Sequence, residues 1–296
     1  MRIAVTGKQG QVVRSLIEKG PLHGVEIVAI GRPEADLTDR HAVKAAIEEA
    51  RPDAVVSAAA YTQVDKAESE RELAFAVNAE GAQCVAEAAS ALRVPVIHLS
   101  TDYVFSGSKI GPYVETDPTG PVSVYGLSKL EGERRVAAAA ADHVVLRTCW
   151  VYSPFGANFL KTMLRLAETR DTLGVVADQT GCPTSALDIA DAVIGIAKRL
   201  KSDPSPELRG TFHLSAQGKA SWADFAEAIF AGLQSRGGKA VAVNRIATAD
   251  YPTPAARPAN SLLATDKLRA AYGIILPEWR KSVETVLDRL LSNGAP

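Results

Sequence analysis

The chain has 296 residues, 47% of them apolar and 23% charged, which is ordinary for a globular protein with one large domain or a large domain and a smaller partner. The formal net charge is −1 at pH 7, with no basic stripe and no acidic tail, so we expect neither nucleic acid nor an anionic membrane as a partner. No apolar run reaches membrane-spanning length, and predicted structure begins at residue 2, so we expect no signal peptide. The three cysteines lack paired spacing and indicate reduced thiols. Together these features predict a cytoplasmic protein.

A strand, a glycine turn and a helix open the chain. Residues 2–6 are a β-rich run, and helical periodicity follows to about Lys19. This layout is typical of a dinucleotide site, because one glycine permits a tight turn and the next lets a pyrophosphate approach the N–H groups at the helix start. Val13 replaces the third glycine of the pattern, so we expect the helix to be pushed outward and cofactor binding to be weakened but not lost. The residues assigned to this part of the site are Gly7, Gly10, Gln11 and Val12.

The end of the second predicted strand, at residues 25–30, indicates which cofactor is used. Arg32 follows this strand where an acidic residue would bind the ribose 2′-hydroxyl, and an arginine there suits a 2′-phosphate. The sequence therefore favours NADPH, with NADH possible. The alternative is that Arg32 is only a solvated loop charge.

Two further stretches are assigned to the cofactor site. One lies shortly after Arg32, and the other follows the third strand, where small residues would let a cofactor pass close over the strand end. The residues are Asp36, Leu37, Ala58, Ala59, Ala60, Tyr61 and Thr62.

Strands and helices alternate along the first half of the chain. Besides those above, we expect strands at 53–57, 94–99 and 144–148, and helices at 39–50 and 73–92. The polar stretch 65–70 is expected to be a loop. Alternation of this kind implies a parallel sheet covered by helices on both faces, so the predicted fold class is α/β, with a Rossmann-type doubly wound parallel sheet.

Tyr125 and Lys129 stand four residues apart in a predicted helix, so their side chains project from one face. A phenol with a pKa of about 10 is a poor acid at neutral pH, and a neighbouring ammonium lowers that pKa. Such a tyrosine can pass a proton to or from a carbinol oxygen while a hydride moves at the carbon. The alternative is an ordinary helix with an exposed lysine. Thr101 lies in a polar run that follows the strand at 94–99, where open parallel sheets place their ligands.

The second half of the chain has a different pattern. We expect helices at 158–169, 187–200 and 221–233, a strand and turn at 174–184, and a short strand at 211–215. The proline-rich stretch 251–258 must be a loop, and its Arg257 could bind a phosphate, although an exposed arginine is the alternative. We therefore divide the chain into an NAD(P)-binding Rossmann domain at 1–153 and a smaller C-terminal, mainly substrate-binding α/β domain at 154–296. Residues 187–215 are expected to pack partly back on the first domain.

Motifs along the whole chain resemble those of one family. They are Gly-Lys-Gln-Gly-Gln-Val at 7–12, Ala-Ala-Ala-Tyr-Thr-Gln-Val-Asp-Lys-Ala-Glu at 58–68, Ser-Thr-Asp-Tyr-Val-Phe at 100–105, Tyr-Gly-Leu-Ser-Lys at 125–129, Arg-Thr-Cys-Trp-Val-Tyr at 147–152, Asp-Gln-Thr-Gly-Cys-Pro-Thr at 178–184 and Tyr-Pro-Thr-Pro-Ala-Ala-Arg-Pro at 251–258. In this order they resemble the dTDP-4-dehydrorhamnose reductase family, within the extended short-chain dehydrogenases/reductases.

The resemblance implies reduction of dTDP-4-dehydrorhamnose, a nucleotide sugar, to dTDP-L-rhamnose by hydride from NADPH. It implies three catalytic residues: Tyr125 protonates the C4 oxygen, Lys129 holds the nicotinamide ribose and lowers the tyrosine pKa, and Thr101 hydrogen-bonds the ketone. Two of these three residues, Tyr125 and Lys129, are also expected to contact the cofactor. The implied substrate-binding residues are Thr101, Asp102, Tyr125, Trp150 and Arg257.

Besides Val13, one further departure from the family pattern and several alternative functions have to be considered. Some family members pair subunits through magnesium held by glutamates, but Ser15 and Leu187 stand at the corresponding positions, so we expect no metal and no metal-linked dimer. A dehydratase would follow the threonine with two acids, whereas Tyr103 follows the aspartate here. An epimerase would favour an acid at Arg32. Another sugar-nucleotide reductase, or a non-catalytic regulatory subunit of methionine adenosyltransferase, could keep the Tyr-Lys pair.

Overall fold

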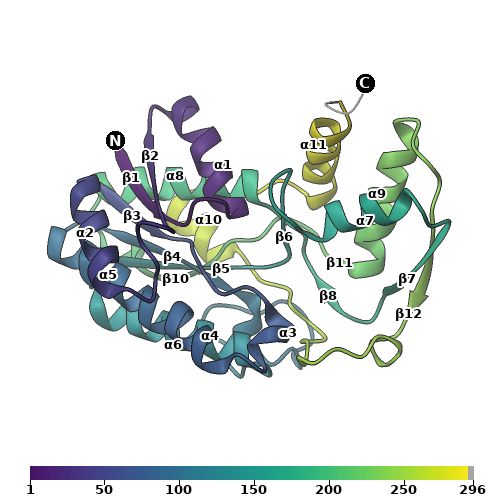
Figure 1. The fold of residues 1–296 in the computed structure, drawn as a ribbon, viewed down its shortest axis with the longest axis horizontal. Helices are drawn as coiled ribbons and strands as arrows, with labels where there is room; N and C mark the ends of the chain where they lie inside the picture. Colours follow the sequence, from purple (N-terminus) through teal and green to yellow (C-terminus); the bar gives the residue numbers. More distant parts are fainter. Residues whose placement is uncertain (293–296) are drawn as a thin grey trace.

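A six-stranded parallel sheet forms the centre of the larger of two lobes in the computed structural model, which describes residues 1–292 (Figure 1). Its strands, in the order in which they lie side by side, are β10 (Gly210–His213), β5 (His143–Thr148), β4 (Val96–Thr101), β3 (Ala54–Ser57), β1 (Arg2–Thr6) and β2 (Glu26–Ile30). Every neighbouring pair is parallel. The order reverses direction between β1 and β3, and such a switch point is where open α/β sheets bind their ligands.

Helices cover both faces of this sheet. Every residue of β3 and of β4 is buried, as expected for strands in a parallel sheet covered on two sides. One face packs against α1 (Gln11–Lys19) and α8 (Ala186–Ser202), and the other against α2 (Arg40–Ala50), α5 (Ala82–Leu92) and α6 (Val124–Ala139). The α/β fold class and the doubly wound parallel sheet predicted from the sequence are confirmed.

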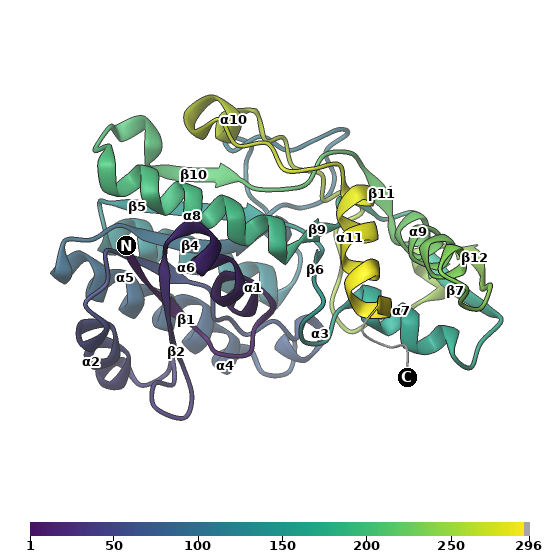
Figure 2. The same cartoon turned by 90° about the horizontal axis from the view of Figure 1, so that it is seen from above.

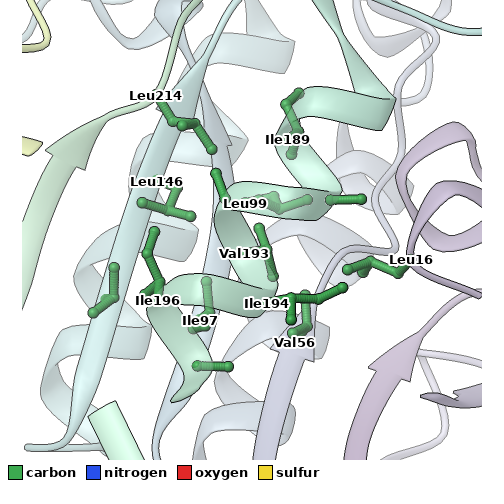
Figure 3. Close-up of a cluster of buried hydrophobic side chains, with 14 of the residues drawn as sticks. Leu16, Val56, Ile97, Leu99, Leu146, Ile189, Val193, Ile194, Ile196 and Leu214 are labelled. Atoms are coloured by element: carbon green, nitrogen blue, oxygen red, sulfur yellow. The ribbon is translucent and has the colours of Figure 1, made fainter. Parts of the chain in front are cut away.

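The core between the sheet and α8 shows how the apolar pattern sets this arrangement. Ile189, Val193 and Ile196 recur at three- and four-residue steps on α8 and point toward Ile97 and Leu146 of the sheet (Figure 3). Fully burying each such side chain contributes roughly 1.5–3 kcal/mol. The segment that contains α8 and β10 is therefore part of the larger lobe, although it lies late in the chain.

The helix expected at 73–92 is divided into three parts. Helix α4 (Arg71–Phe75) continues into a π-helical segment, η2 (Ala76–Gly81), and then into α5. A π-helical turn contains more residues than an α-helical turn, and the buried Asn78 of this segment faces α6. The two helices are so close that a Cβ atom on Gly132 would lie 2.1 Å from the Asn78 backbone carbonyl oxygen. The stretch 65–70 is not wholly a loop, because a short helix, α3 (Val64–Ala67), occupies its start.

The smaller lobe is built around its own apolar core. Phe225 and Trp279 lie at its centre, completely buried. Figures 1 and 2 show its helices and the strands β7 and β12 grouped on one side of the molecule. Its elements are α7 (Phe159–Ala167), β7 (Thr172–Val176) paired in parallel with β12 (Ala242–Ile246), α9 (Trp222–Ser235) and α11 (Trp279–Ser292).

Short strand pairs lie between the lobes, and the chain passes between the lobes more than once. The remaining elements are β6 (Val151–Tyr152) with β9 (Thr184–Ser185), β8 (Thr180–Gly181) with β11 (Ala220–Ser221), α10 (Asp266–Tyr272), and the 3-10 turns Gly20–His23, Asp102–Val104, Pro206–Leu208 and Thr248–Asp250. A division near residue 153 stays a proposal, and in it α8 and β10 belong with the first part of the chain.

Candidate active site

A cleft of about 950 Å³ opens at the carboxyl ends of β1, β3 and β4 and extends to the smaller lobe. It brings together nearly all the residues that the sequence assigned to the site. The assigned residues that line it are Gly7, Gly10, Gln11, Val12, Arg32, Asp36, Leu37, Ala58, Ala59, Ala60, Tyr61, Thr62, Thr101, Asp102, Tyr125, Lys129 and Trp150. A separate hollow of about 420 Å³ lies between α8 and α10, away from these strand ends, and holds none of them.

The glycine turn at one end of the cleft is suited to a pyrophosphate. Gly7 has a φ of +100° and its N–H donates to the Ile30 carbonyl at 2.6 Å, so the turn needs a residue without a side chain. Gly10 is the N-cap residue of α1, and because it has no side chain it leaves the N–H groups of the first turn without a side-chain cap. The N–H groups at the start of a helix with such a cap can bind an anion. The residues present therefore fit a dinucleotide.

Val13, at the third position of the glycine pattern, is accommodated by burial. It is 2% exposed, and its Cγ2 atom lies 3.2 Å from where a Cβ atom on Gly7 would stand. The valine therefore fills the space that Gly7 leaves, and it joins the core between α1 and the sheet. The expected weakening of cofactor binding stays a prediction.

Two cations stand beside the turn. The Arg32 side chain is 82% exposed, with its Nε atom 3.8 Å from the Asp36 carboxylate. Lys8, which sequence reasoning missed, also lines the cleft and pairs with Glu34. Its position inside the glycine turn was the available signal, because a side chain at that point must lie near any phosphate bound there.

Buried polar contacts fix the loop after β3. The Thr6 hydroxyl accepts hydrogen bonds from the N–H groups of Ala58 (3.0 Å) and Ala59 (3.1 Å). The Asn78 amide accepts from the Tyr61 N–H at 2.8 Å and donates to the Ser128 hydroxyl at 2.9 Å. Asn78 thus ties the loop to the helix that carries Tyr125 and Lys129. The sequence analysis missed it, since a single asparagine in an alanine-rich helix gave no signal.

Thr101 and Tyr125 lie against each other at the end of β4. The Thr101 hydroxyl donates to the Asp102 carboxylate at 2.8 Å and accepts from the Tyr103 N–H at 3.2 Å. Burial raises the pKa of Tyr125 to about 12, and its hydrogen bond with Thr101 only partly opposes this rise. The phenol is therefore protonated at neutral pH and can act as a proton donor.

Burial raises the pKa of Tyr125, and the expected lowering of that pKa by Lys129 stays a prediction. The Lys129 amine lies at the buried wall of the cleft, where it donates to the Leu99 carbonyl at 2.6 Å and lies 3.4 Å from His98 Nε2. Burial lowers the pKa of Lys129 to about 8, while the charge of Glu133 acts in the opposite direction. Desolvation of the phenol is the largest cause of the raised pKa of Tyr125.

Asp102 is buried beside this pair. Burial raises its pKa to about 6, and hydrogen bonds from Ser261 and Thr101 oppose the rise. Because the folded-state pKa lies above the usual value of about 3.9, an ionised Asp102 costs stability as the pH rises through this range.

Stacked tryptophans form the wall of the cleft toward the smaller lobe. The centroids of the Trp150 and Trp222 rings lie 3.6 Å apart, and the angle between the ring planes is 8°. Trp150 has a φ of +47°, which is unusual for a bulky residue, and a Cβ atom on Gly181 would lie 2.5 Å from its ring. Trp222 donates to Gln179 at 3.2 Å. Trp222 was not among the residues assigned from the sequence, because its stacking on the distant Trp150 arises only on folding.

Arg257 is the one assigned residue that does not line the cleft. Its guanidinium makes two hydrogen bonds to the Asp65 carboxylate, at 3.1 and 2.9 Å, which fasten the loop at 251–258 to α3. Its expected role in binding the substrate stays a prediction.

The two positions considered for a metal are both buried. Ser15 donates to the Gln11 carbonyl at 2.9 Å, and Leu187 is 7% exposed. Within residues 1–292, no group of three or more His, Cys, Asp or Glu side chains could hold a metal ion. None of the helices over the same range is long and apolar enough to span a membrane.

We expect a chelator to leave activity unchanged. Hard cations need several oxygen ligands, and the side chains of Ser15 and Leu187 supply no carboxylate. Turnover should be equal before and after EDTA treatment, and the mass in solution should not change when magnesium is added. Loss of activity with EDTA that magnesium restores would contradict this expectation.

Three features occur together here: the strand order reverses between β1 and β3, the first turn of α1 has free N–H groups, and a tyrosine and a lysine on one helix lie near a threonine at a strand end. This combination is typical of short-chain dehydrogenases/reductases, which bind a nicotinamide dinucleotide. Comparisons with known proteins define the family within this class. The family model described as "RmlD substrate binding domain" matches residues 1–292. The chain is 56% identical over 294 residues to the dTDP-4-dehydrorhamnose reductase of Sinorhizobium fredii, covering 99% of each chain, and 44% identical to that of Burkholderia thailandensis, covering 99% of this chain and all of the relative.

Solved structures agree with the sequence relatives. The dTDP-4-dehydrorhamnose reductase of Clostridium acetobutylicum matches with a TM-score of 0.91 at 37% identity, over 98% of this chain and 100% of that one. The Bacillus anthracis enzyme of the same name, in complex with NADP, matches with a TM-score of 0.90 at 34% identity, over 97% and 99%. The chain belongs to the dTDP-4-dehydrorhamnose reductase family, as its motifs predicted.

Proposed function

We propose that this protein reduces dTDP-4-dehydrorhamnose to dTDP-L-rhamnose with NADPH. The observation that carries the proposal is the convergence of Thr101, Tyr125 and Lys129 in one cleft whose other end is the open glycine turn. Full-length similarity to enzymes named for this reaction supports it, as does the NADP complex of the Bacillus anthracis relative.

The cofactor would lie along the strand ends. The N–H groups after Gly10 would hold its pyrophosphate, Arg32 its 2′-phosphate and Lys129 its nicotinamide ribose. NADPH, when bound, supplies the hydride that reduces the C4 ketone. Ala58 and Ala59 have small side chains, so they leave room for the cofactor above β3.

Tyr125 would donate its phenolic proton to the C4 oxygen as negative charge develops there. The phenol is protonated at neutral pH even at its usual pKa of about 10, and burial raises that pKa to about 12. Thr101 would hydrogen-bond the same oxygen, a stabilisation that acts as the charge develops. In the structure the Thr101 hydroxyl donates to Asp102, so it must turn away from that carboxylate when the ketone arrives.

The sugar would lie between this pair and the stacked tryptophans. Trp150 and Trp222 offer a flat apolar surface against one face of the ring, and Asp102 offers a carboxylate for a sugar hydroxyl. The test is a turnover assay with dTDP-4-dehydrorhamnose, followed by NADPH absorbance. No oxidation of NADPH, together with tight binding to a methionine adenosyltransferase, would favour the non-catalytic alternative.

Replacing Arg32 with alanine should shift cofactor preference toward NADH. The arginine is largely exposed, so its removal should not disturb the fold, and the lost contact with a 2′-phosphate should weaken NADPH roughly ten- to a hundredfold relative to NADH. Dissociation constants for both cofactors, measured by fluorescence titration, test this. Equal losses for NADPH and NADH would show that Arg32 does not contact the phosphate.

A further inference from the structure

A buried polar chain runs inward from Lys129, away from the cleft. His98 of β4 lies between Lys129 of α6 and Ser57 of β3, and these three residues are 1–2% exposed. Lys129 Nζ lies 3.4 Å from His98 Nε2, and Ser57 Oγ lies 3.1 Å from His98 Nδ1. Ser57 and His98 are paired in register on neighbouring strands, so the sheet itself fixes their relative position.

The direction of these hydrogen bonds follows from the chemistry of the groups. An ammonium has three N–H donors and no lone pair, so the nitrogen of His98 that faces it must be the acceptor. The proton of the neutral ring is then on Nδ1, where it is donated to Ser57. Burial and the nearby Lys129 charge hold the pKa of His98 well below its usual value, which keeps the ring neutral.

The charged groups around Lys129 leave this contact available. Glu133, one turn further along α6, is bound by Arg147 of β5 at 2.7 Å and by the Ser100 hydroxyl of β4 at 2.5 Å. The Leu99 carbonyl takes one N–H of the amine, at 2.6 Å. His98 Nε2 is the next acceptor within reach.

We propose that His98 is a positioning residue that accepts a second N–H of Lys129, so that the amine is held at the cleft wall with its third N–H directed to the ligand. The inference rests on the proposed function insofar as that ligand is NADPH. A lysine with four rotatable bonds loses much conformational freedom when it binds, and two fixed acceptors would remove that cost before the cofactor arrives.

Three substitutions separate this role from space filling. In His98→Gln, the amide oxygen can reach the place of Nε2 and accept from Lys129. In His98→Asn, the shorter side chain reaches only the place of Nδ1, and in His98→Leu there is no acceptor at all. We expect His98→Gln to bind NADPH within about threefold of the parent protein, whereas His98→Asn and His98→Leu should bind it roughly tenfold more weakly, the effect of one lost hydrogen bond.

The measurements are NADPH titration by protein fluorescence, which needs no turnover, and thermal unfolding of each variant. Equal NADPH affinity for His98→Gln and His98→Asn would overturn the inference. If a variant does not fold, the parent protein still decides: long-range ¹H–¹⁵N NMR at neutral pH should show the His98 ring protonated on Nδ1 alone, and a ring protonated on Nε2 would overturn the proposal.

These outcomes are distinct from those that test the reaction. A parent protein that binds NADPH, shows the difference between glutamine and asparagine, and does not reduce the keto sugar would refute the proposed function and leave the role of His98 intact. A parent protein that reduces the sugar, with no such difference among the variants, would support the proposed function and refute the role of His98.

Discussion

Replacing Tyr125 with phenylalanine should lower turnover of dTDP-4-dehydrorhamnose by roughly 10²–10⁴-fold, the usual contribution of a general acid. The substitution keeps the ring, which packs edge-to-face on Tyr103 with centroids 5.7 Å apart, and removes only the hydroxyl. NADPH affinity should therefore stay within a few-fold of the parent value. Steady-state turnover and a cofactor titration measure the two quantities.

The matched control is Tyr272→Phe, which removes another partly buried phenol. That hydroxyl donates to the Leu208 carbonyl far from the cleft, so turnover should not change. A Tyr125→Phe variant that keeps turnover within a few-fold of the parent would show that another group donates the proton.

The buried ion pair behind the site should have the largest effect on stability. Arg147 and Glu133 are joined at 2.7 Å with side chains only 6% and 7% exposed. Removing the cation in Arg147→Met would leave a buried carboxylate with only the Ser100 hydroxyl as a close partner, at an expected cost of about 3–5 kcal/mol. Chemical denaturation measures the change in the free energy of unfolding.

Two further variants make this experiment specific. The double variant Glu133→Gln with Arg147→Met should recover much of the loss, because neither charge of this ion pair is left without the other. Lys44→Met, at the more exposed pair with Glu87, should cost less than about 1 kcal/mol, since solvent screens that interaction. Similar losses for Arg147→Met and Lys44→Met would mean that burial does not control the energy of the inner pair.

Local patterns made the first half of the fold predictable. The run 2–6, the glycine turn and the alternation of strands with helices each depend on neighbouring residues, so β1, α1 and the parallel sheet could be read from the chain. Residues 187–215 were expected to pack partly back on the first domain, but the pairing of β10 with β5 depends on contacts between distant residues, such as Phe212 with Tyr272, and no local pattern contains that information.

The residues of the site also fall into those that the sequence could predict and those that it could not. Residues at strand ends and in spaced motifs, such as Thr101 with Tyr125, could be found because sheet topology places strand ends together. Trp222 and His98 could not, because each acquires its neighbour only after folding. The raised pKa of Tyr125 also depends on folding, since the spacing to Lys129 indicates proximity but not which groups the amine contacts or how much water is excluded.

The return of α8 and β10 to the sheet has a consequence for truncated forms of the protein. A chain cut after residue 153 would contain the whole glycine turn and the Tyr-Lys pair, yet it would lack the helix that covers Ile97 and Leu146 and the strand that protects the edge of β5. An uncovered apolar face beside an unpaired strand favours aggregation. The nucleotide-binding half is therefore not a module that could be inherited or transplanted alone, and an insertion in the smaller lobe is tolerated only if the chain can still return to complete the sheet.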